Sequence, residues 1–224
     1  MNPERPRRLS FYRRLSAEQK REYDRSDARR SLPLVPAAAL GAAADDVVRA
    51  LEDGALARVR KAAQRLVDGV CASLNARSRR TAPATPRVKV LRTRPRRGQS
   101  EFHGLYTRFE NGECEICVWM LTAANGHVVK PRTFLRTLLH EVCHHVDMTL
   151  FDLPHSLHTL GFHARESSLL RALERSGATI PGGRQAAPPE PPRSAEAPRV
   201  ARQLDLFSRW SAGSSSGRRQ ERGD

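Results

Sequence analysis

Residues 138–147, LLHEVCHHVD, place two histidines four positions apart with a glutamate between them. A helix turns about 100° per residue, so His140 and His144 lie on one face, about 40° apart. Two imidazoles at this spacing can bind one zinc ion. Glu141 is rotated about 60° beyond His144 and can reach a metal-bound water without occupying a coordination position. This His-Glu-x-x-His arrangement is typical of zinc-assisted hydrolysis with the glutamate as general base.

A catalytic zinc ion also requires a third protein ligand and a position left open for water. Four side chains downstream of the histidine pair offer suitable atoms: His155, His158, His163 and Glu166. Glu166 is in phase with the apolar residues of a helix expected over 162–176, so it faces inward with them. We expect His163 to point elsewhere and His155 to belong to the preceding loop.

The histidine pair needs a helix, and one is expected over 131–150, because a proline suits the first helical turn. The apolar residues of this segment form one arc opposite the pair, and this arc must face the core. His145 lies at the edge of the arc and is expected to be structural. Asp147 lies near the pair, where it either orients an imidazole or is solvated.

Further elements follow from periodicity and capping. Apolar residues spaced three to five positions apart predict one long helix or two over 43–75, with Gly54 as the weak point. Ser16 and Gln19 form a capping box that predicts a short helix over 16–30. Three segments are typical of strands: 88–91, 104–109 and 115–121.

The stretch HEVCHH followed by SLHTLGFHARES resembles the SprT-like metallopeptidase family. In that family, a third histidine follows the His-Glu-x-x-His motif after a loop and directly precedes a helix with an aromatic residue near its start. His158 follows His144 after thirteen residues, and Phe162 opens the next helix. The resemblance therefore implies that His158 is the third zinc ligand. Glu166 is the alternative, because glutamate-ligated zincins place their third ligand on the inward face of such a helix. Many relatives carry a Cys-rich zinc ribbon, whereas this chain has no cysteine after Cys143.

The resemblance also implies an α+β, zincin-like fold with a small sheet packed on helices. We expect a basic helical extension over 1–42, a SprT-like zincin domain over 43–180 and a disordered tail over 181–224, which is rich in proline and glycine. Zincin peptidases commonly bind an extended substrate along a sheet edge above the metal, a role expected here for the strand over 115–121. Trp119 on that strand either lines the cleft or belongs to the core.

The formal net charge of +15 lies mostly outside the near-neutral segment 111–180. The densest basic run, RVKVLRTRPRR (87–97), predicts contacts with DNA phosphates. The arginines expected to make them are Arg92, Arg94, Arg96 and Arg97. The alternative is that the high arginine content reflects a coding bias and that the basic run is only a solvated face.

A short motif in the tail, QLDLF, resembles the segment with which bacterial repair and replication proteins bind the sliding clamp. An apolar cluster in a segment that cannot build a core usually marks a binding site. The alternative is a short helix that packs back on the domain. The motif comprises Gln203, Leu204, Asp205, Leu206 and Phe207.

The cellular setting is expected to be cytoplasmic. The chain has no apolar run near 18 residues and no apolar core of a secretory signal, and its four cysteines suit reduced thiols. Cys114 and Cys117 lack a second pair and are interpreted as buried thiols.

The expected function is a zinc metallopeptidase that cleaves proteins or peptides, associated with DNA and acting on DNA-bound or crosslinked proteins. One alternative is a DNA- or clamp-binding adaptor with a structural zinc site, which would not need Glu141. Another is an ImmA/IrrE-like peptidase of a regulator, which would favour Glu166 as a ligand.

Overall fold

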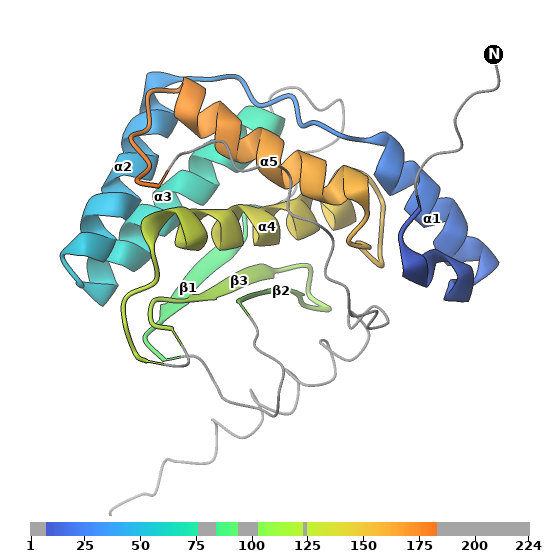
Figure 1. The fold of residues 1–224 in the computed structure, drawn as a ribbon, viewed down its shortest axis with the longest axis horizontal. Coiled ribbons are helices and arrows are strands. Elements are labelled where there is room, and N and C mark those ends of the chain that lie inside the picture. The colour runs from blue at the N-terminus through green and yellow to red at the C-terminus, as the bar shows by residue number, and fades with distance from the viewer. Residues whose placement is uncertain (1–7, 76–83, 94–102, 123–124, 183–224) are drawn as a thin grey trace, which may run out of the picture.

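A three-stranded sheet lies beneath two layers of helices in the computed structural model (Figure 1). The structure describes residues 8–75, 84–93, 103–122 and 125–182. In chain order, its elements are η1 (Ser10–Arg14), α1 (Ala17–Ala28), α2 (Ala38–Glu52), α3 (Leu56–Asn75), β1 (Arg87–Leu91), β2 (Gly104–Arg108), β3 (Cys114–Trp119), α4 (Pro131–Thr149) and α5 (Leu160–Arg175). The expected α+β class is confirmed.

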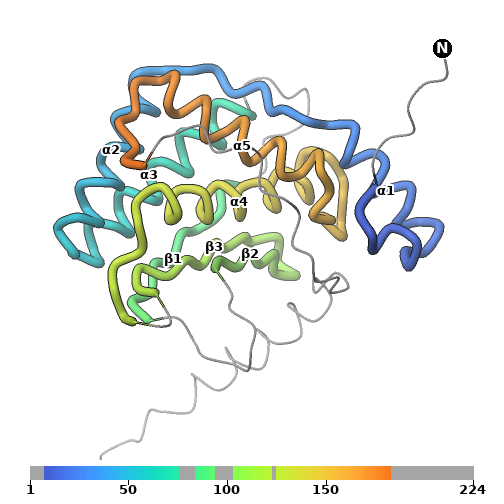
Figure 2. Tube along the Cα trace, viewed as in Figure 1, coloured from blue at the N-terminus to red at the C-terminus, as the bar shows by residue number. Residues whose placement is uncertain are grey.

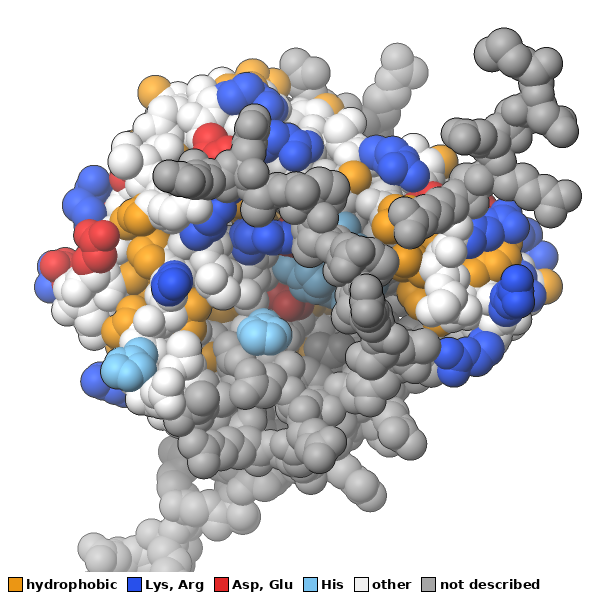
Figure 3. All heavy atoms as spheres, in the orientation of Figure 1, with side chains coloured by type: hydrophobic (Ala, Val, Ile, Leu, Met, Phe, Trp, Pro, Cys, Tyr) orange, Lys and Arg blue, Asp and Glu red, His pale blue; other side chains and the backbone are white. Residues whose placement is uncertain are grey.

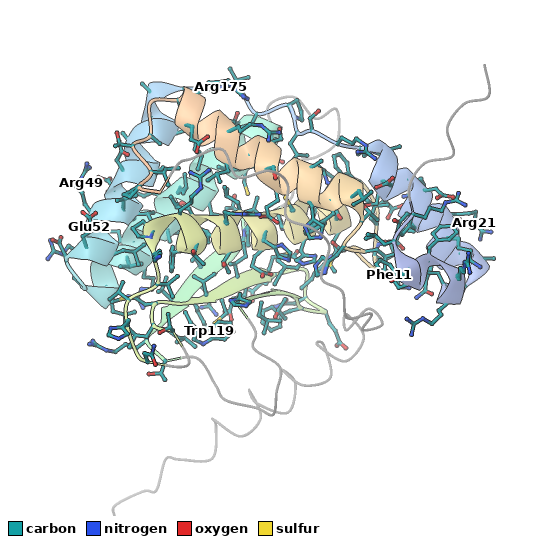
Figure 4. The ribbon with its side chains drawn as sticks, viewed as in Figure 1. Phe11, Arg21, Arg49, Glu52, Trp119 and Arg175 are labelled. Atoms are coloured by element: carbon teal, nitrogen blue, oxygen red, sulfur yellow. The ribbon has the colours of Figure 1, made fainter. Side chains whose placement is uncertain are left out.

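The strand order is β1-β3-β2, with β1 parallel and β2 antiparallel to the central strand β3. Ile116 and Val118 of β3 belong to the main core, whereas Trp119 lies on the sheet face away from the helices (Figure 4). The prediction that segment 115–121 forms a sheet edge is wrong, because β3 is paired on both sides. Its nearly continuous apolar run is typical of such a central strand, and β2 is an edge strand instead.

Helices α3 and α4 cover one face of the sheet, α3 over β1 and α4 over β2 and β3. Helix α5 packs on the far side of α4, and α2 packs against α3 (Figure 2). The segment expected as one helix or two is two, because Gly54 between α2 and α3 adopts a φ of 65°, a conformation that glycine adopts without steric cost. The core between these layers is apolar, with Phe134, Leu138 and Val142 of α4 buried in it.

Helix α1 lies at one end of the molecule and packs against α5 (Figure 1). The predicted capping box is present, with the Ser16 hydroxyl accepting from the Gln19 N–H and the Gln19 side chain accepting from the Ser16 N–H. The segment 29–37 then runs along the helical layer from α1 to α2 (Figure 2). Leu32 and Leu34 anchor this segment in the main core.

Candidate metal centre

Three imidazoles converge at the surface of α4. Helix α4 presents His140 and His144, and loop 150–159, which joins α4 to α5, presents His158. The Nε2 atom of His144 lies 3.2 Å from Nε2 of His140 and 3.0 Å from Nε2 of His158. A tetrahedral ion with Zn–N bonds of about 2.0–2.1 Å separates its nitrogen ligands by about 3.3 Å. These three residues could hold a metal ion.

Contacts behind the imidazoles fix which nitrogen faces the centre. The Nδ1 atom of His140 lies 3.2 Å from Oε2 of Glu166, and Nδ1 of His144 lies 2.7 Å from Oγ of Ser156. The Glu166 carboxylate accepts a hydrogen bond from His140, so Nδ1 carries the proton and Nε2 keeps its lone pair. Metal-binding histidines usually have such a partner on the second nitrogen, which sets the ring orientation.

A buried ion pair continues this arrangement behind His144. The Ser156 hydroxyl donates to Oδ2 of Asp147 at 3.1 Å, so its oxygen is available to accept from the His144 ring. Asp147 in turn receives two bonds from the guanidinium of Arg165, at 2.7 and 2.9 Å, and both side chains are fully buried. Of the two interpretations of Asp147, solvation is therefore wrong, and Asp147 acts on His144 through Ser156.

Glu166 lies behind His140 instead of beside the three Nε2 atoms. Its other oxygen, Oε1, accepts from Nε of Arg136 at 3.0 Å, whereas Nδ1 of His163 lies 3.7 Å from Oε2. Burial raises the pKa of Glu166, but the hydrogen bonds from His140 and His163 and the charge of Arg136 outweigh it, so the pKa is lowered. Glu166 is thus ionised at neutral pH. Its position behind His140 is the one that an orienting carboxylate usually occupies behind a metal-binding histidine.

Burial and the neighbouring imidazoles of His140 and His158 lower the pKa of His144 well below its usual value. At neutral pH its ring is therefore uncharged and its Nε2 lone pair is free for a metal ion. Burial also lowers the pKa of His140, but the bond to Glu166 and the nearby carboxylates outweigh this effect, so the pKa is raised. Of the three imidazoles, His140 is the one whose Nδ1 atom lies directly against a carboxylate, that of Glu166.

The glutamate between the two histidines is buried between α4 and β2. Its carboxylate accepts a hydrogen bond from the backbone N–H of Tyr106, and burial raises the pKa of Glu141 to about 7. Its Oε2 atom is buried with no hydrogen-bond partner among the described residues. A Cβ atom on Gly104 would lie 2.4 Å from Oε1 of Glu141, so glycine at the start of β2 leaves the room that this carboxylate occupies.

Two further histidines of this region, His145 and His155, have contacts outside the three-imidazole cluster. The buried His145 lies 3.2 Å from the hydroxyl of Tyr106 through Nδ1 and packs edge-on against its ring, in agreement with the structural role expected for it. His155 belongs to loop 150–159, as expected, and its ring lies against Glu22 of α1. Histidine side chains gather at the middle of the face shown in Figure 3, close to Lys and Arg side chains.

Sequence reasoning missed three residues of this centre: Glu22, Ser156 and Arg165. Glu22 and Ser156 carry no periodic signal that links them to α4. Arg165 did carry a periodic signal, because it lies one helical turn before Leu169 on the inward face of α5. A buried arginine requires a buried partner, so this position could have indicated a buried acidic residue nearby.

The expected DNA- and clamp-binding residues lie mostly outside the described residues. Arg92 is exposed just after β1. Arg94, Arg96, Arg97 and the QLDLF motif over 203–207 are not among the residues that the structure describes.

All four cysteines are buried and unpaired, which agrees with the interpretation of Cys114 and Cys117 as buried thiols. Burial raises the pKa of Cys71 and of Cys117 to about 12, so neither thiol ionises at neutral pH. None of the described helices combines the length and apolar character needed to cross a bilayer.

Comparisons of this chain with family models, with curated proteins and with solved structures gave no match.

Proposed function

We propose that this chain is a zinc-dependent metallopeptidase of the SprT-like type. The observation that supports this most is the convergence of three imidazole Nε2 atoms, together with the carboxylate of Glu141. This carboxylate interacts electrostatically with His140 and has a buried oxygen with no partner among the described residues. His140, His144 and His158 would hold the ion, which supplies a Lewis acid that polarises water and the scissile carbonyl. Imidazole ligands and hydrolytic chemistry favour zinc among the divalent metals.

Glu141 is the general base of this proposal. It accepts a proton from the attacking water and passes it to the leaving amine, as general acid–base catalysis requires. A pKa near 7 suits a group that must do both at neutral pH. The Tyr106 N–H and the space at Gly104 hold the carboxylate in place, while its second oxygen has no protein partner within the described part of the chain.

The substrate is proposed to be an extended stretch of protein or peptide that adds to the outer edge of β2. The backbone of β2 pairs with β3 on one side only, within the described residues, and its Tyr106 directly contacts the proposed base. Main-chain pairing along a sheet edge gives affinity with little dependence on side chains.

The test combines metal content with proteolysis of an unstructured protein such as casein. Wild-type protein should carry one zinc ion per chain, and His140→Ala or His144→Ala should lose it. Glu141→Gln should keep the zinc and reduce cleavage by about 10²–10⁴-fold.

His145→Gln is the matched control for these variants. His145 is adjacent to His144 in the chain, but its ring faces Tyr106, so this variant should keep both zinc and activity. Wild-type cleavage by Glu141→Gln would refute the assignment of Glu141 as the general base.

The adaptor with a structural zinc site is the second candidate. Structural zinc sites are closed by four protein ligands, whereas the cluster found among the described residues offers three. Zinc bound by wild-type protein, combined with equal and negligible cleavage by wild-type and Glu141→Gln, would favour the adaptor.

DNA is proposed as the setting of the enzyme, supported by the net charge of +15 and by the basic run over 87–97. Affinity for DNA should fall steeply with salt, and neutralising Arg92, Arg94, Arg96 and Arg97 should flatten that dependence. The QLDLF motif is proposed to bind a sliding clamp with micromolar affinity. Leu206→Ala with Phe207→Ala should abolish that binding and leave the zinc content unchanged.

A further inference from the structure

The carboxylate of Glu22 on α1 reaches into the loop that supplies the third histidine. It is 5% exposed. One oxygen accepts from the backbone N–H groups of His155 and Ser156, at 2.8 and 3.1 Å, and the other lies against Nδ1 of the His155 ring. Glu22 thus binds two consecutive amides of loop 150–159 from a position more than a hundred residues earlier in the chain.

Ser156 needs this support because of its backbone conformation. Its φ is 41°, in the left-handed region, and Asp152 in the same loop has a φ of 54°. A non-glycine residue in this region is strained and persists only where its surroundings hold it. The bond from the Ser156 N–H to Glu22 is one such restraint, and the turn it fixes aims the Ser156 hydroxyl at Nδ1 of His144.

Three neighbours of Glu22 on α1 bind the same region. Arg25 donates to the carbonyls of Phe151 and Asp152. Ser26 lies 3.2 Å from the Thr159 hydroxyl, and Asp27 accepts from the Gly161 N–H at 2.8 Å. These contacts flank His158 on both sides, so α1 holds both ends of the loop that carries the ligand.

We propose that Glu22 is a positioning residue of the metal centre, through which α1 holds loop 150–159 so that Ser156 and His158 face His144. Metal affinity then depends on a helix that contributes no ligand. This inference rests on the metal binding of the proposed function, though not on its peptidase activity. It assigns α1, expected from the sequence only as part of a basic extension over 1–42, to the centre itself.

The experiment measures zinc affinity of the full chain by competition with a chromophoric chelator, together with thermal unfolding of the metal-free protein. Glu22→Ala removes the acceptor and should weaken zinc binding by about 10–100-fold, as loss of an outer partner of a metal site does. Glu22→Gln keeps one oxygen acceptor without the charge, and hydrogen bonds to a charged group are about twice as strong. Its loss of affinity should therefore lie between those of Glu22→Ala and the wild type.

Asp24→Asn is the matched control. Asp24 lies on the same helix and also accepts hydrogen bonds, but from the exposed Arg8 and from Tyr12. Its removal should leave zinc affinity unchanged. A merely structural Glu22 would lower the unfolding temperature without changing the zinc affinity of the folded protein, and that result overturns the inference.

Two other outcomes are also decisive. If Glu22→Ala does not fold, the zinc affinity of Glu22→Gln tests the inference in its place. An affinity of Glu22→Gln equal to that of Asp24→Asn overturns the inference. If the wild-type chain itself binds no zinc, the proposed function fails, a result that no Glu22 variant can imitate.

Discussion

Two regions of this molecule are built on different principles. In the pair α2 and α3, the buried side chains are apolar or small, as Val47 and Leu66 illustrate, and charged residues such as Arg49 and Glu52 project outward from α2 (Figure 4). Where α1, the end of α4, loop 150–159 and α5 meet, many of the buried side chains are polar or charged. These polar and charged side chains are Glu22, Ser26, Asp27, Asp147, Ser156, Thr159, Arg165 and Glu166.

The difference concerns what each kind of contact can specify. Apolar packing stabilises in proportion to buried area and has little directional preference. Buried hydrogen bonds and ion pairs add little net stability, but each fixes the position of its partner, and an unpaired member is costly. We therefore expect the apolar region to control how stable the fold is, and the polar region to control where His144 and His158 lie.

The largest effect is expected from breaking the buried ion pair. Asp147→Ala leaves the fully buried Arg165 without its carboxylate, and loss of one partner of a buried pair costs about 3–5 kcal/mol. Urea denaturation of the metal-free protein measures the loss. Zinc affinity should fall as well, because the Ser156 hydroxyl loses its acceptor and no longer orients His144. A loss below about 1 kcal/mol would place this pair with surface ion pairs and remove the distinction between the two regions.

A substitution in the apolar region that costs a comparable amount of stability should leave the metal centre intact. Leu66→Ala on α3 deletes a fully buried side chain and should cost about 2–5 kcal/mol, through lost transfer energy and the cavity that remains. Helix α3 packs against α2 and β1, away from loop 150–159. Chelator competition at a temperature where the variant is folded should give the zinc affinity of the wild type. Weakened binding would show that packing, too, positions the ligands.

The same contrast explains what the sequence could predict. Helices α3 and α4 were predictable because their apolar residues recur with the helical period, and the turn at Gly54 because glycine tolerates a positive φ. The positions of His140 and His144 relative to one another followed from the same period. Each of these features depends on residues that are close in the chain.

Features that depend on distant residues were not predictable. Nothing near Ser156 indicates that Glu22 binds its amide, because the two are 134 positions apart and lie in different elements. The order of the strands in the sheet was likewise not predictable from the sequence, and β3 was wrongly expected at an edge. His158 as a ligand came from a family resemblance, and only the folded loop brings its Nε2 atom next to His144.

An intermediate effect is expected from Glu166, which orients His140. Glu166→Gln removes the charge that holds Nδ1 of His140 and should weaken zinc binding by about 10–100-fold, or about 1.4–2.8 kcal/mol. Glu174→Gln on the same helix breaks only the ion pair with Arg132 and should leave the affinity unchanged. Complete loss of zinc from Glu166→Gln, with full retention by His158→Ala, would instead identify Glu166 as the third ligand.

The smallest effect is expected from ion pairs at the surface of the apolar region. Asp46 on α2 accepts from Arg49 on the same helix and from Arg65 on α3, and all three side chains are substantially exposed. Exposed pairs contribute about 0–1 kcal/mol, because water screens the charges and two long side chains lose freedom. Asp46→Ala should therefore lower stability by less than about 1 kcal/mol in urea denaturation, and less still in high salt. Zinc affinity should not change. A salt-insensitive loss as large as that of Asp147→Ala would mean that charges at the surface of the apolar region are as costly to unpair as those buried in the polar region. The contrast between the two regions would then not hold.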